Sequence, residues 1–377
     1  MEQPDYNRTF NIQQTNMAKG IACILLLIHH LFYDDPHWQN LFTPMFPFLQ
    51  LHGKPLITIF AMQAKVCVAI FIFLSGYGLT ASFSKKFSGI LSLTNSIRFV
   101  CSHIVKLFIS YWFIFIIFVP WGAIFGHNSL TIWNYNPVNA FNDIFGISFL
   151  FGTDSVNVTW WFISAIILLY ILFPIFMILS KNGVFPLLIV ALIITFDPLL
   201  SLLPFQFKIL SDWLLPFVLG MILSNTNAFN RIDSSNIKVK ETIEILFVVL
   251  IAAILCYTYG IKFYSLLAIS IILFSYLVLS KSVFFMNILG RIGNNSSNIF
   301  MFHTFIYYYY FEKYIYVFKY PILIFVVLLF ICYFISLLLE KLKSALRIDK
   351  ISLWLSAKIL GNTMQQPANA SGEQKVS

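Results

Sequence analysis

Residues 17–33 read MAKGIACILLLIHHLFY, an apolar run that begins beside Lys19 and ends in a histidine pair, His29 and His30. A helix that crosses a bilayer needs about 20 mostly apolar residues, because lipid offers no partners for unpaired backbone groups. We therefore expect this stretch to form a membrane-spanning helix. It has no small-residue cleavage site at its end, so we expect the helix to be retained.

The rest of the chain has the same character. Of its 377 residues, 59% are hydrophobic and only 10% are charged, and 42 are Phe. A soluble domain carries about 25% charged residues, so the composition excludes a soluble globular protein. The five cysteines lie in apolar runs without CxxC spacing, which indicates buried thiols rather than a disulfide scaffold or a metal site.

Nine further stretches are long and apolar enough to span. The sequence therefore predicts an all-α, polytopic membrane helix bundle of about ten transmembrane helices, with approximate bounds 17–33, 64–83, 100–122, 160–180, 184–203, 210–225, 242–259, 263–280, 297–312 and 320–340. A shorter apolar patch at 141–152 is too brief to cross, and we expect it to lie at the interface or to re-enter.

The placement of cations indicates the orientation. With ten spans both termini share one side, and that side holds 18 of the 24 Lys and Arg residues. Cytoplasmic loops carry the excess of Lys and Arg, so we expect both termini to be cytoplasmic. Most of these cations then set the orientation of the protein in the membrane and contact lipid headgroups. The net charge of +9 therefore does not indicate nucleic-acid binding. We expect a membrane domain over residues 1–345 and a cytoplasmic, partly disordered tail over 346–377.

Ionisable groups at membrane depth are costly and are therefore candidate sites. Lys19 and His30 are eleven residues apart, which places them about 16 Å apart along a helix and on nearly the same face. One wall of a cavity could thus carry a cation at the cytoplasmic end and a deeper imidazole able to take a proton from a hydroxyl. His29 points about 100° away from His30. The alternative is that both histidines are ordinary polar groups near the outer interface.

Three other fragments have a functional and a structural interpretation. Arg98, Ser102 and Lys106 form one stripe that could hold phosphates or anchor the helix among headgroups. The small residues around Ser75 allow helices to pack closely or expose backbone to a ligand. His303 is an intramembrane imidazole for which an interior structural hydrogen bond is the competing role. No zinc, P-loop, Rossmann or Gly-x-Ser-x-Gly pattern occurs, and we expect no metal.

Taken together, the fragments resemble the acyltransferase-3 family of bacterial integral-membrane O-acyltransferases over about residues 15–340. The matching phrases, in chain order, are Lys19 with His30, Leu74-Ser75-Gly76-Tyr77, Lys106 through Tyr111-Trp112, Trp161-Phe162, Leu215 through Gly220, and Leu289-Gly290-Arg291-Ile292 through His303. Lys19 and Lys106 stand where the family has Arg, which keeps the charge but loses the bidentate fork.

The resemblance implies transfer of an acyl group, usually acetyl, from cytosolic acyl-CoA to a carbohydrate hydroxyl on or near the outer face of the bacterial cytoplasmic (inner) membrane. It implies that His30 acts as general base or relays the acyl group. It further implies that cations bind the phosphates of the donor, namely Lys19, Arg98, Lys106 and Arg291. Other side chains would bind the substrate or stabilise the tetrahedral intermediate, namely His29, Ser75, Tyr111, Trp161 and His303.

Two functions from other classes stay open. A transporter or flippase for a small polar or lipid-linked sugar would use His30 and His303 to bind its substrate, and would transfer nothing. No carboxylate pair lies in mid-span, which is atypical of a proton-coupled carrier. A glycan polymerase would favour a cationic outer loop, and the 123–159 loop has no Lys or Arg.

Overall fold

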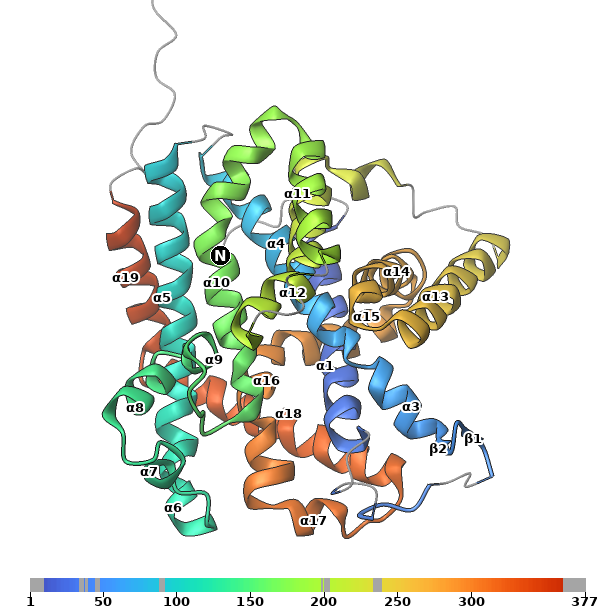
Figure 1. Ribbon diagram of the computed structural model, residues 1–377, viewed down its shortest axis with the longest axis vertical. Coiled ribbons are helices and arrows are strands. Elements are labelled where there is room, and N and C mark those ends of the chain that lie inside the picture. Colours follow the sequence, from blue (N-terminus) through green and yellow to red (C-terminus); the bar gives the residue numbers. More distant parts are fainter. Residues whose placement is uncertain are drawn as a thin grey trace, which may run out of the picture.

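A computed structural model of the chain describes residues 10–33, 37, 40–44, 48–87, 92–197, 199, 204–232 and 239–361. Over these residues the protein is a helical bundle with one two-residue hairpin, β1 (Gln50–Leu51) and β2 (Lys54–Pro55) (Figure 1). The hairpin turn holds His52 and Gly53 at φ 51° and 76°, which is the backbone twist that short hairpins require. The polytopic helical fold expected from the sequence is confirmed.

Seven segments of the described chain are long and apolar enough to cross a membrane. They contain α1 (Ile12–Phe32), α3 and α4 (Leu56–Gln63, Val66–Phe87), α5 with η1 and α6 (Leu93–Phe118, Val119–Trp121, Gly122–Phe125), η2 and α10 (Val158–Trp160, Trp161–Leu179), α13 (Val239–Tyr259), η6, α14 and η7 (Ile261–Phe263, Tyr264–Leu277, Leu279–Lys281), and α18 (Pro321–Ala345). Each overlaps one of the ten predicted spans.

The other three predicted spans are helical but shorter or more polar. The stretch 184–203 begins with α11 (Val184–Phe196), which ends after 13 residues, and residues 198 and 200–203 lie outside the described part. The stretch 210–225 lies within α12 (Phe205–Asn225), which contains Pro216 and Asp212. The stretch 297–312 is interrupted, with α16 (Ser296–Thr304), a π-helical turn η8 (Phe305–Tyr310) and α17 (Glu312–Tyr316). The count of ten crossings stays a prediction.

Two helices of more than ten residues, in the part of the chain that the structure describes, fall where the sequence predicted none. The loop expected after residue 280 contains α15 (Val283–Asn294), which packs along α1 with Leu289, Ile292 and Gly293 buried. The predicted tail begins with α19 (Ile348–Leu360), which packs along α5, and Ser356 donates a hydrogen bond to the Ser102 carbonyl (3.1 Å) (Figure 1). Residues 362–377, expected to be disordered, lie outside the described residues.

Glycines allow the closest helix crossings. A Cβ at Gly293 would lie 1.8 Å from the Asn16 carbonyl oxygen, and one at Gly20 would lie 2.0 Å from that of Leu289. The same relation joins α4 and α12 through Gly76 and Gly220. Backbone contact of this kind is how small residues join helices within a membrane. It fixes α1, which carries Lys19, and α4, which carries Ser75.

Short elements between α5 and α10 form a cap at one end of the bundle. They comprise α6, α7 (Ser129–Ile132), α8 (Pro137–Ile144), α9 (Ser148–Phe151) and η2 (Figure 1). The apolar patch predicted at 141–152 therefore forms parts of α8 and α9, and both are too short to span. Minor turns η3 (Ser180–Asn182) and η5 (Ala228–Arg231) follow α10 and α12.

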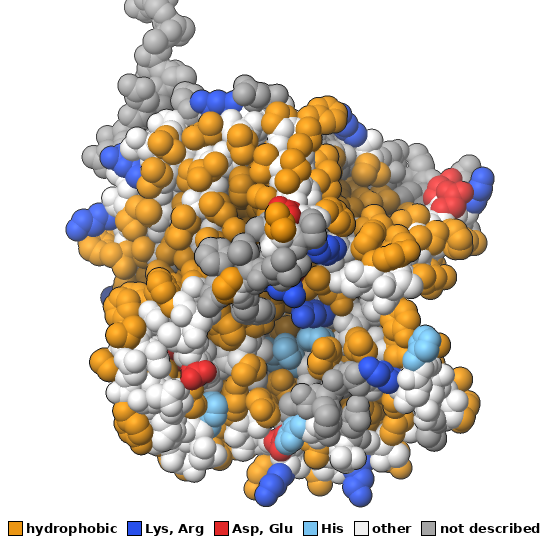
Figure 2. All heavy atoms as spheres, in the orientation of Figure 1, with side chains coloured by type: hydrophobic (Ala, Val, Ile, Leu, Met, Phe, Trp, Pro, Cys, Tyr) orange, Lys and Arg blue, Asp and Glu red, His pale blue; other side chains and the backbone are white. Residues whose placement is uncertain are grey.

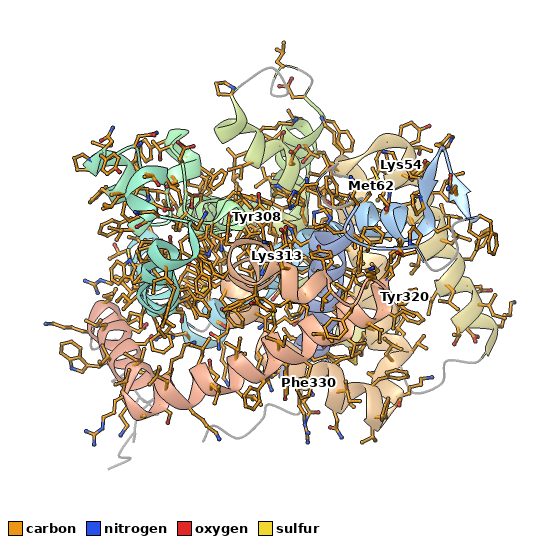
Figure 3. All side chains as sticks on the ribbon, turned by 90° about the horizontal axis from the view of Figure 1, so that it is seen from below. Lys54, Met62, Tyr308, Lys313, Tyr320 and Phe330 are labelled. Atoms are coloured by element: carbon orange, nitrogen blue, oxygen red, sulfur yellow. The ribbon has the colours of Figure 1, made fainter. Side chains whose placement is uncertain are left out.

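Apolar side chains cover much of the outer surface, as a bilayer requires. Figure 2 shows this apolar face interrupted near its centre, where Lys, Arg and His side chains gather. Seen from below, α18 runs across the bundle from Tyr320, and Phe330 on it points outward and is 71% exposed (Figure 3).

Candidate active site

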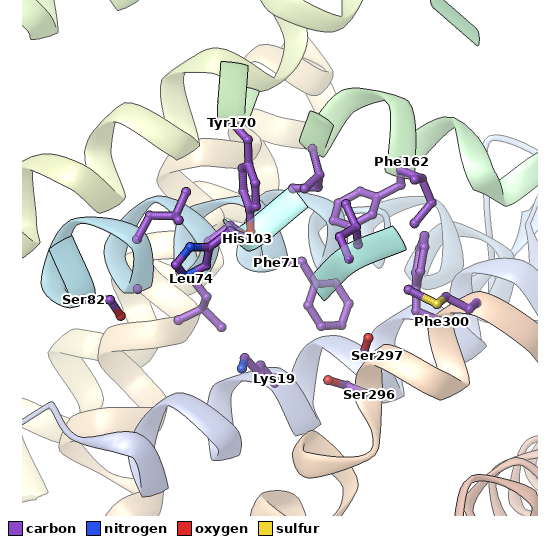
Figure 4. Close-up of a pocket in the computed structure, with 17 residues that line it drawn as sticks. Lys19, Phe71, Leu74, Ser82, His103, Phe162, Tyr170, Ser296, Ser297 and Phe300 are labelled. Carbon is purple, nitrogen blue, oxygen red and sulfur yellow. The ribbon is translucent and has the colours of Figure 1, made fainter. Parts of the chain in front are cut away.

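A cavity of about 340 Å³ lies among five helices (Figure 4). Its lining comes from α1 (Lys19), α4 (Phe71, Leu74, Ser75, Gly78, Leu79, Ser82), α5 (His103, Leu107), α10 (Phe162, Ile163, Ile166, Tyr170) and α16 (Ser296, Ser297, Phe300, Met301). Lys19 and Ser75 were both predicted as site residues, and the fold brings them to one cavity.

One end of the cavity is cationic. Lys19 is the one Lys or Arg among the lining residues, and the lining contains no carboxylate. His103 also faces the cavity, and Lys86 and Lys106 are close enough to interact electrostatically with it. A partly buried cation without a carboxylate partner favours an anionic ligand, because such a charge is costly until it is paired. This end therefore suits phosphate or another anion.

The other end of the cavity is aromatic. The Phe300 ring centroid lies 4.7 Å from that of Phe162 and 6.4 Å from that of Phe71, and the Phe71 and Phe162 centroids are 6.3 Å apart. Figure 4 places Phe162 and Phe300 opposite Ser82 along the cavity. We call these three phenylalanine side chains the aromatic wall. An uncharged group fits against it.

A histidine cluster lies behind the aromatic wall. The Phe300 and His303 ring centroids are 6.3 Å apart, and His303 lies 5.1 Å from His30 by the same measure. His30 is also near Tyr307, at 6.2 Å. Lys19 lines the cavity together with Ser296 and Ser297 of α16, whereas His30 is not among the lining residues and lies beside His303 of the same helix. Phe300 lies at the boundary between the cavity and the cluster.

Hydrogen bonds fix two of the three imidazoles. The His303 Nδ1–H donates to the carbonyls of Ile299 (3.0 Å) and Phe300 (2.9 Å), while its buried Nε2 has no hydrogen-bond partner among the residues that the structure describes. The His29 Nδ1–H donates to the Ala61 carbonyl (2.8 Å). Only carbonyl oxygens face these two Nδ1 atoms, so each Nδ1 carries the hydrogen and each Nε2 has a lone pair. No hydrogen bond to His30 forms among the described residues, which leaves its ring nitrogens available to a substrate.

The remaining predicted residues lie outside the cavity. Arg98 and Arg291 are exposed, and Arg98 lies beside Gly361 at the end of α19. Lys106 is half-buried near Lys86 and His103. The predicted cations Arg98, Lys106 and Arg291 do not form one cluster with Lys19.

The two predicted aromatic donors have partners elsewhere. Tyr111 is fully buried, and its hydroxyl donates to the Asp143 carbonyl (2.6 Å), so it fastens α5 to the cap. Trp161 stacks on Trp213, with ring centroids 5.8 Å apart, next to the aromatic wall. Neither indole nor phenol faces the cavity lining.

A further cation near the histidines was missed from the sequence. Lys65 follows a break between α3 and α4, and it interacts electrostatically with His29, His30 and Asp212. Its position among outer-side cations was visible in the sequence, but nothing in the spacing linked it to α1. The break between the two helices brings Lys65 toward the histidines.

A second missed feature is a buried polar network that holds α16 against α18. The Lys343 ammonium donates to the Asn298 side chain (2.6 Å) and to Glu340 (3.0 Å), and Asn298 donates to Ser336 (3.1 Å). Lys343 is only 6% exposed. From the sequence it was one of many inner-side cations, and its burial depends on the tertiary fold.

The cap that precedes α10 has its own polar centre. Asp143 accepts hydrogen bonds from Trp133 Nε1 (2.9 Å), the Val156 amide (2.8 Å) and Ser155 (2.6 Å). Burial raises the pKa of Asp143, and these hydrogen bonds oppose the rise. Burial lowers the pKa of His127, whose Nε2–H donates to the Val156 carbonyl (2.7 Å) and whose ring stacks on Tyr309.

The arrangement places the cation of the cavity lining, the aromatic wall and the histidine cluster in one region of the bundle. Among the described residues no group of three or more His, Cys, Asp or Glu side chains could hold a metal ion. The geometry is therefore suited to receive a polyanionic molecule by its charged end and to present its neutral end beside imidazoles.

The family model described as an acyltransferase domain, that of the acyltransferase-3 family, matches residues 12–341 of the chain. No curated protein and no solved structure gives a significant match. The matched range begins at the start of α1, ends within α18 and contains every residue that lines the cavity. The chain belongs to the acyltransferase-3 family, and the protein is a multi-pass membrane acyltransferase.

Proposed function

We propose that the protein transfers an acetyl group from cytosolic acetyl-CoA to a hydroxyl of a cell-envelope or exported glycan, in the bacterial cytoplasmic membrane. The observation that carries the proposal is the line from Lys19 through the cavity to His30. Lys19 offers the one cation of the cavity lining to a polyanionic donor, and His30 has no protein partner for its ring nitrogens among the described residues.

In this mechanism Lys19 holds donor phosphate or a nearby anionic group, and the half-buried Lys106 and exposed Arg98 and Arg291 attract the nucleotide from the cytosol. The cavity is at the small end of the range for ligand pockets. It therefore accommodates the thioester arm, while the nucleotide stays at the cationic mouth.

His30 takes the proton of the acceptor hydroxyl as its oxygen attacks the thioester carbonyl carbon. The tetrahedral intermediate collapses, the carbon–sulfur bond breaks, and the CoA thiolate leaves and receives the proton from His30. Ser75 and Tyr170 line the cavity with their hydroxyls hydrogen-bonded to each other, and Ser75 would turn from Tyr170 to donate to the developing oxyanion. His303 and His29 position His30 from either side.

The test uses the purified protein in nanodiscs with acetyl-CoA labelled on the acetyl group, with and without an envelope-glycan extract. We expect glycan-dependent release of CoA and transfer of label. In His30→Ala the rate should fall about 100-fold or more, as expected for loss of a general base. His52→Ala is the matched control, because His52 lies in the hairpin turn and its ring bonds to Tyr257.

His29→Ala should reduce the rate less than His30→Ala, since the His29 ring is held by a backbone carbonyl. Equal activity of His30→Ala and wild type, with both folded, would remove His30 from the mechanism. Absence of CoA release from any short acyl-CoA, with any extract, would overturn the proposed function and favour a transporter.

A further inference from the structure

The aromatic wall lines the end of the cavity that lies nearest the histidines. Phe300 is 7% exposed and contacts Phe162 and Phe71 on one side and His303 on the other. Phe71 lies on α4, which packs closely on α12 through Gly76 and Gly220. Phe300 lies on α16, which is held to α18 by the hydrogen bonds of Asn298. The wall is thus built from positioned side chains rather than from a loop.

The orientation of a donor in this cavity depends on charge. An acyl thioester of a nucleotide has an anionic end and a neutral acyl end. Lys19 and His103 lie toward the opposite end from Phe162 and Phe300 (Figure 4). The anionic end of the bound donor therefore lies beside Lys19, and its acyl group packs against the aromatic wall.

We infer that the aromatic wall, and Phe300 above all, sets the length of the acyl group, so that the enzyme takes a short acyl donor and excludes longer chains. This inference rests on the proposed function. Packed rings at this end limit the room beside the thioester carbonyl, so each added methylene would have to displace a packed side chain. Close-packed interiors resist such displacement.

Chain-length preference is the measurement that tests the inference. CoA release would be followed with acetyl-, butanoyl- and hexanoyl-CoA at saturating envelope extract, as kcat/KM for each donor. We expect wild type to prefer acetyl over hexanoyl by about tenfold or more, because one methylene in a pocket is worth about tenfold or more in discrimination. In Phe300→Ala the preference should shrink to about threefold or less, or reverse.

Phe302→Leu and Phe300→Leu form a matched pair. Phe302 lies on the same helix, is fully buried and stacks on Phe118 with centroids 5.2 Å apart, but it does not line the cavity. We expect Phe300→Leu to relax the preference and Phe302→Leu to leave it unchanged. If Phe300→Ala fails to fold, Phe162→Leu enlarges the same end and should relax the preference in the same direction.

The outcomes separate the two proposals. CoA release from acetyl-CoA with an unchanged preference in the folded Phe300 and Phe162 variants would overturn the inference and leave the acyltransferase function intact. Equal use of all three donors by wild type would also overturn it. No release from any donor by wild type would overturn the proposed function itself.

Discussion

Lys19 is a cation within a cavity lining that has no carboxylate to balance it. A charge-assisted hydrogen bond to a ligand is worth about 1.5–3 kcal/mol. We therefore expect Lys19→Met to raise the KM for the acyl donor by about tenfold to 100-fold with a smaller change in kcat. Lys19→Arg should retain more donor affinity than Lys19→Met, because it keeps the charge. Lys341→Met, which removes an exposed cation from α18, is the control. Equal donor affinity in all of these proteins would exclude a role for Lys19 in holding phosphate.

The residues show what spacing can and cannot predict. Eleven residues in a helix place Lys19 and His30 on nearly one face whatever packs against it, and in the structure Lys19 lines the cavity while His30 lies beside His303. Tyr111 and Trp161 were chosen by their place in the phrases, yet Tyr111 donates to the Asp143 carbonyl and Trp161 stacks on Trp213. Partners of that kind come from distant parts of the chain, and no local pattern encodes them.

At the scale of elements, α1 and α15 meet backbone to backbone. Alanine is intrinsically better than glycine in a helix by about 1 kcal/mol, but a Cβ at Gly293 would lie 1.8 Å from the Asn16 carbonyl oxygen. We expect Gly293→Ala to lower the apparent melting temperature in detergent, with a net cost of about 1–3 kcal/mol for the forced separation. Gly290→Ala, on the same helix and with open space at its Cβ, should be neutral or stabilising. A higher melting temperature for Gly293→Ala would contradict the packing.

The cap between α5 and α10 should loosen in mild acid. His127 has its pKa lowered by burial from the ordinary value of 6.5, so the folded cap binds its proton less tightly than the open loop does. The resulting stability is present above pH 6.5 and is lost as the pH falls toward the lowered pKa. Hydrogen exchange of residues 126–157 should therefore rise between pH 7 and pH 5, after correction for intrinsic rates.

His127→Phe keeps an aromatic ring against Tyr309 and removes the titration. We expect this variant to lose the rise in exchange between pH 7 and pH 5. Asp143 is unchanged in it and acts in the opposite sense, because its raised pKa makes acid favour the folded cap. The difference between the two proteins thus isolates His127. An identical pH dependence in both would assign the effect to another group.

Helix boundaries also divide into predictable and unpredictable ones. The span predicted at 160–180 corresponds to α10, and that at 320–340 to α18. In lipid, a long uninterrupted apolar run must form a helix to satisfy its backbone hydrogen bonds. The amphipathic α15 was missed because its apolar face, with Leu289 and Ile292, is too short to look like a span. The break before Lys65 and the π-helical turn are stabilised by contacts with other helices, and they leave no mark in hydropathy.

For the molecule as a whole, the distribution of cations predicts the orientation. Single cysteines at Lys313, Lys281 and Lys341, all exposed positions, would be placed in a Cys101→Ser background, since Cys101 is the exposed native thiol among the five. An impermeant maleimide should label position 313 in intact cells, and positions 281 and 341 only after permeabilisation. The reverse pattern would invert the proposed route from cytosolic donor to outer acceptor.

The π-helical turn after His303 has a consequence for how the family can vary. In this wide turn the tyrosines contact different parts of the protein. Tyr307 lies near His30. Tyr309 accepts a hydrogen bond from the Val158 amide, and Tyr310 donates one to the Phe118 carbonyl. Removing one residue from 305–310 would restore an ordinary helix and rotate the downstream residues by about 100°. The loss of a single codon here would therefore uncouple the histidine cluster from the cap without altering any residue of the donor cavity. Such a deletion would change the surroundings of His30 while leaving the lining of the cavity as it is.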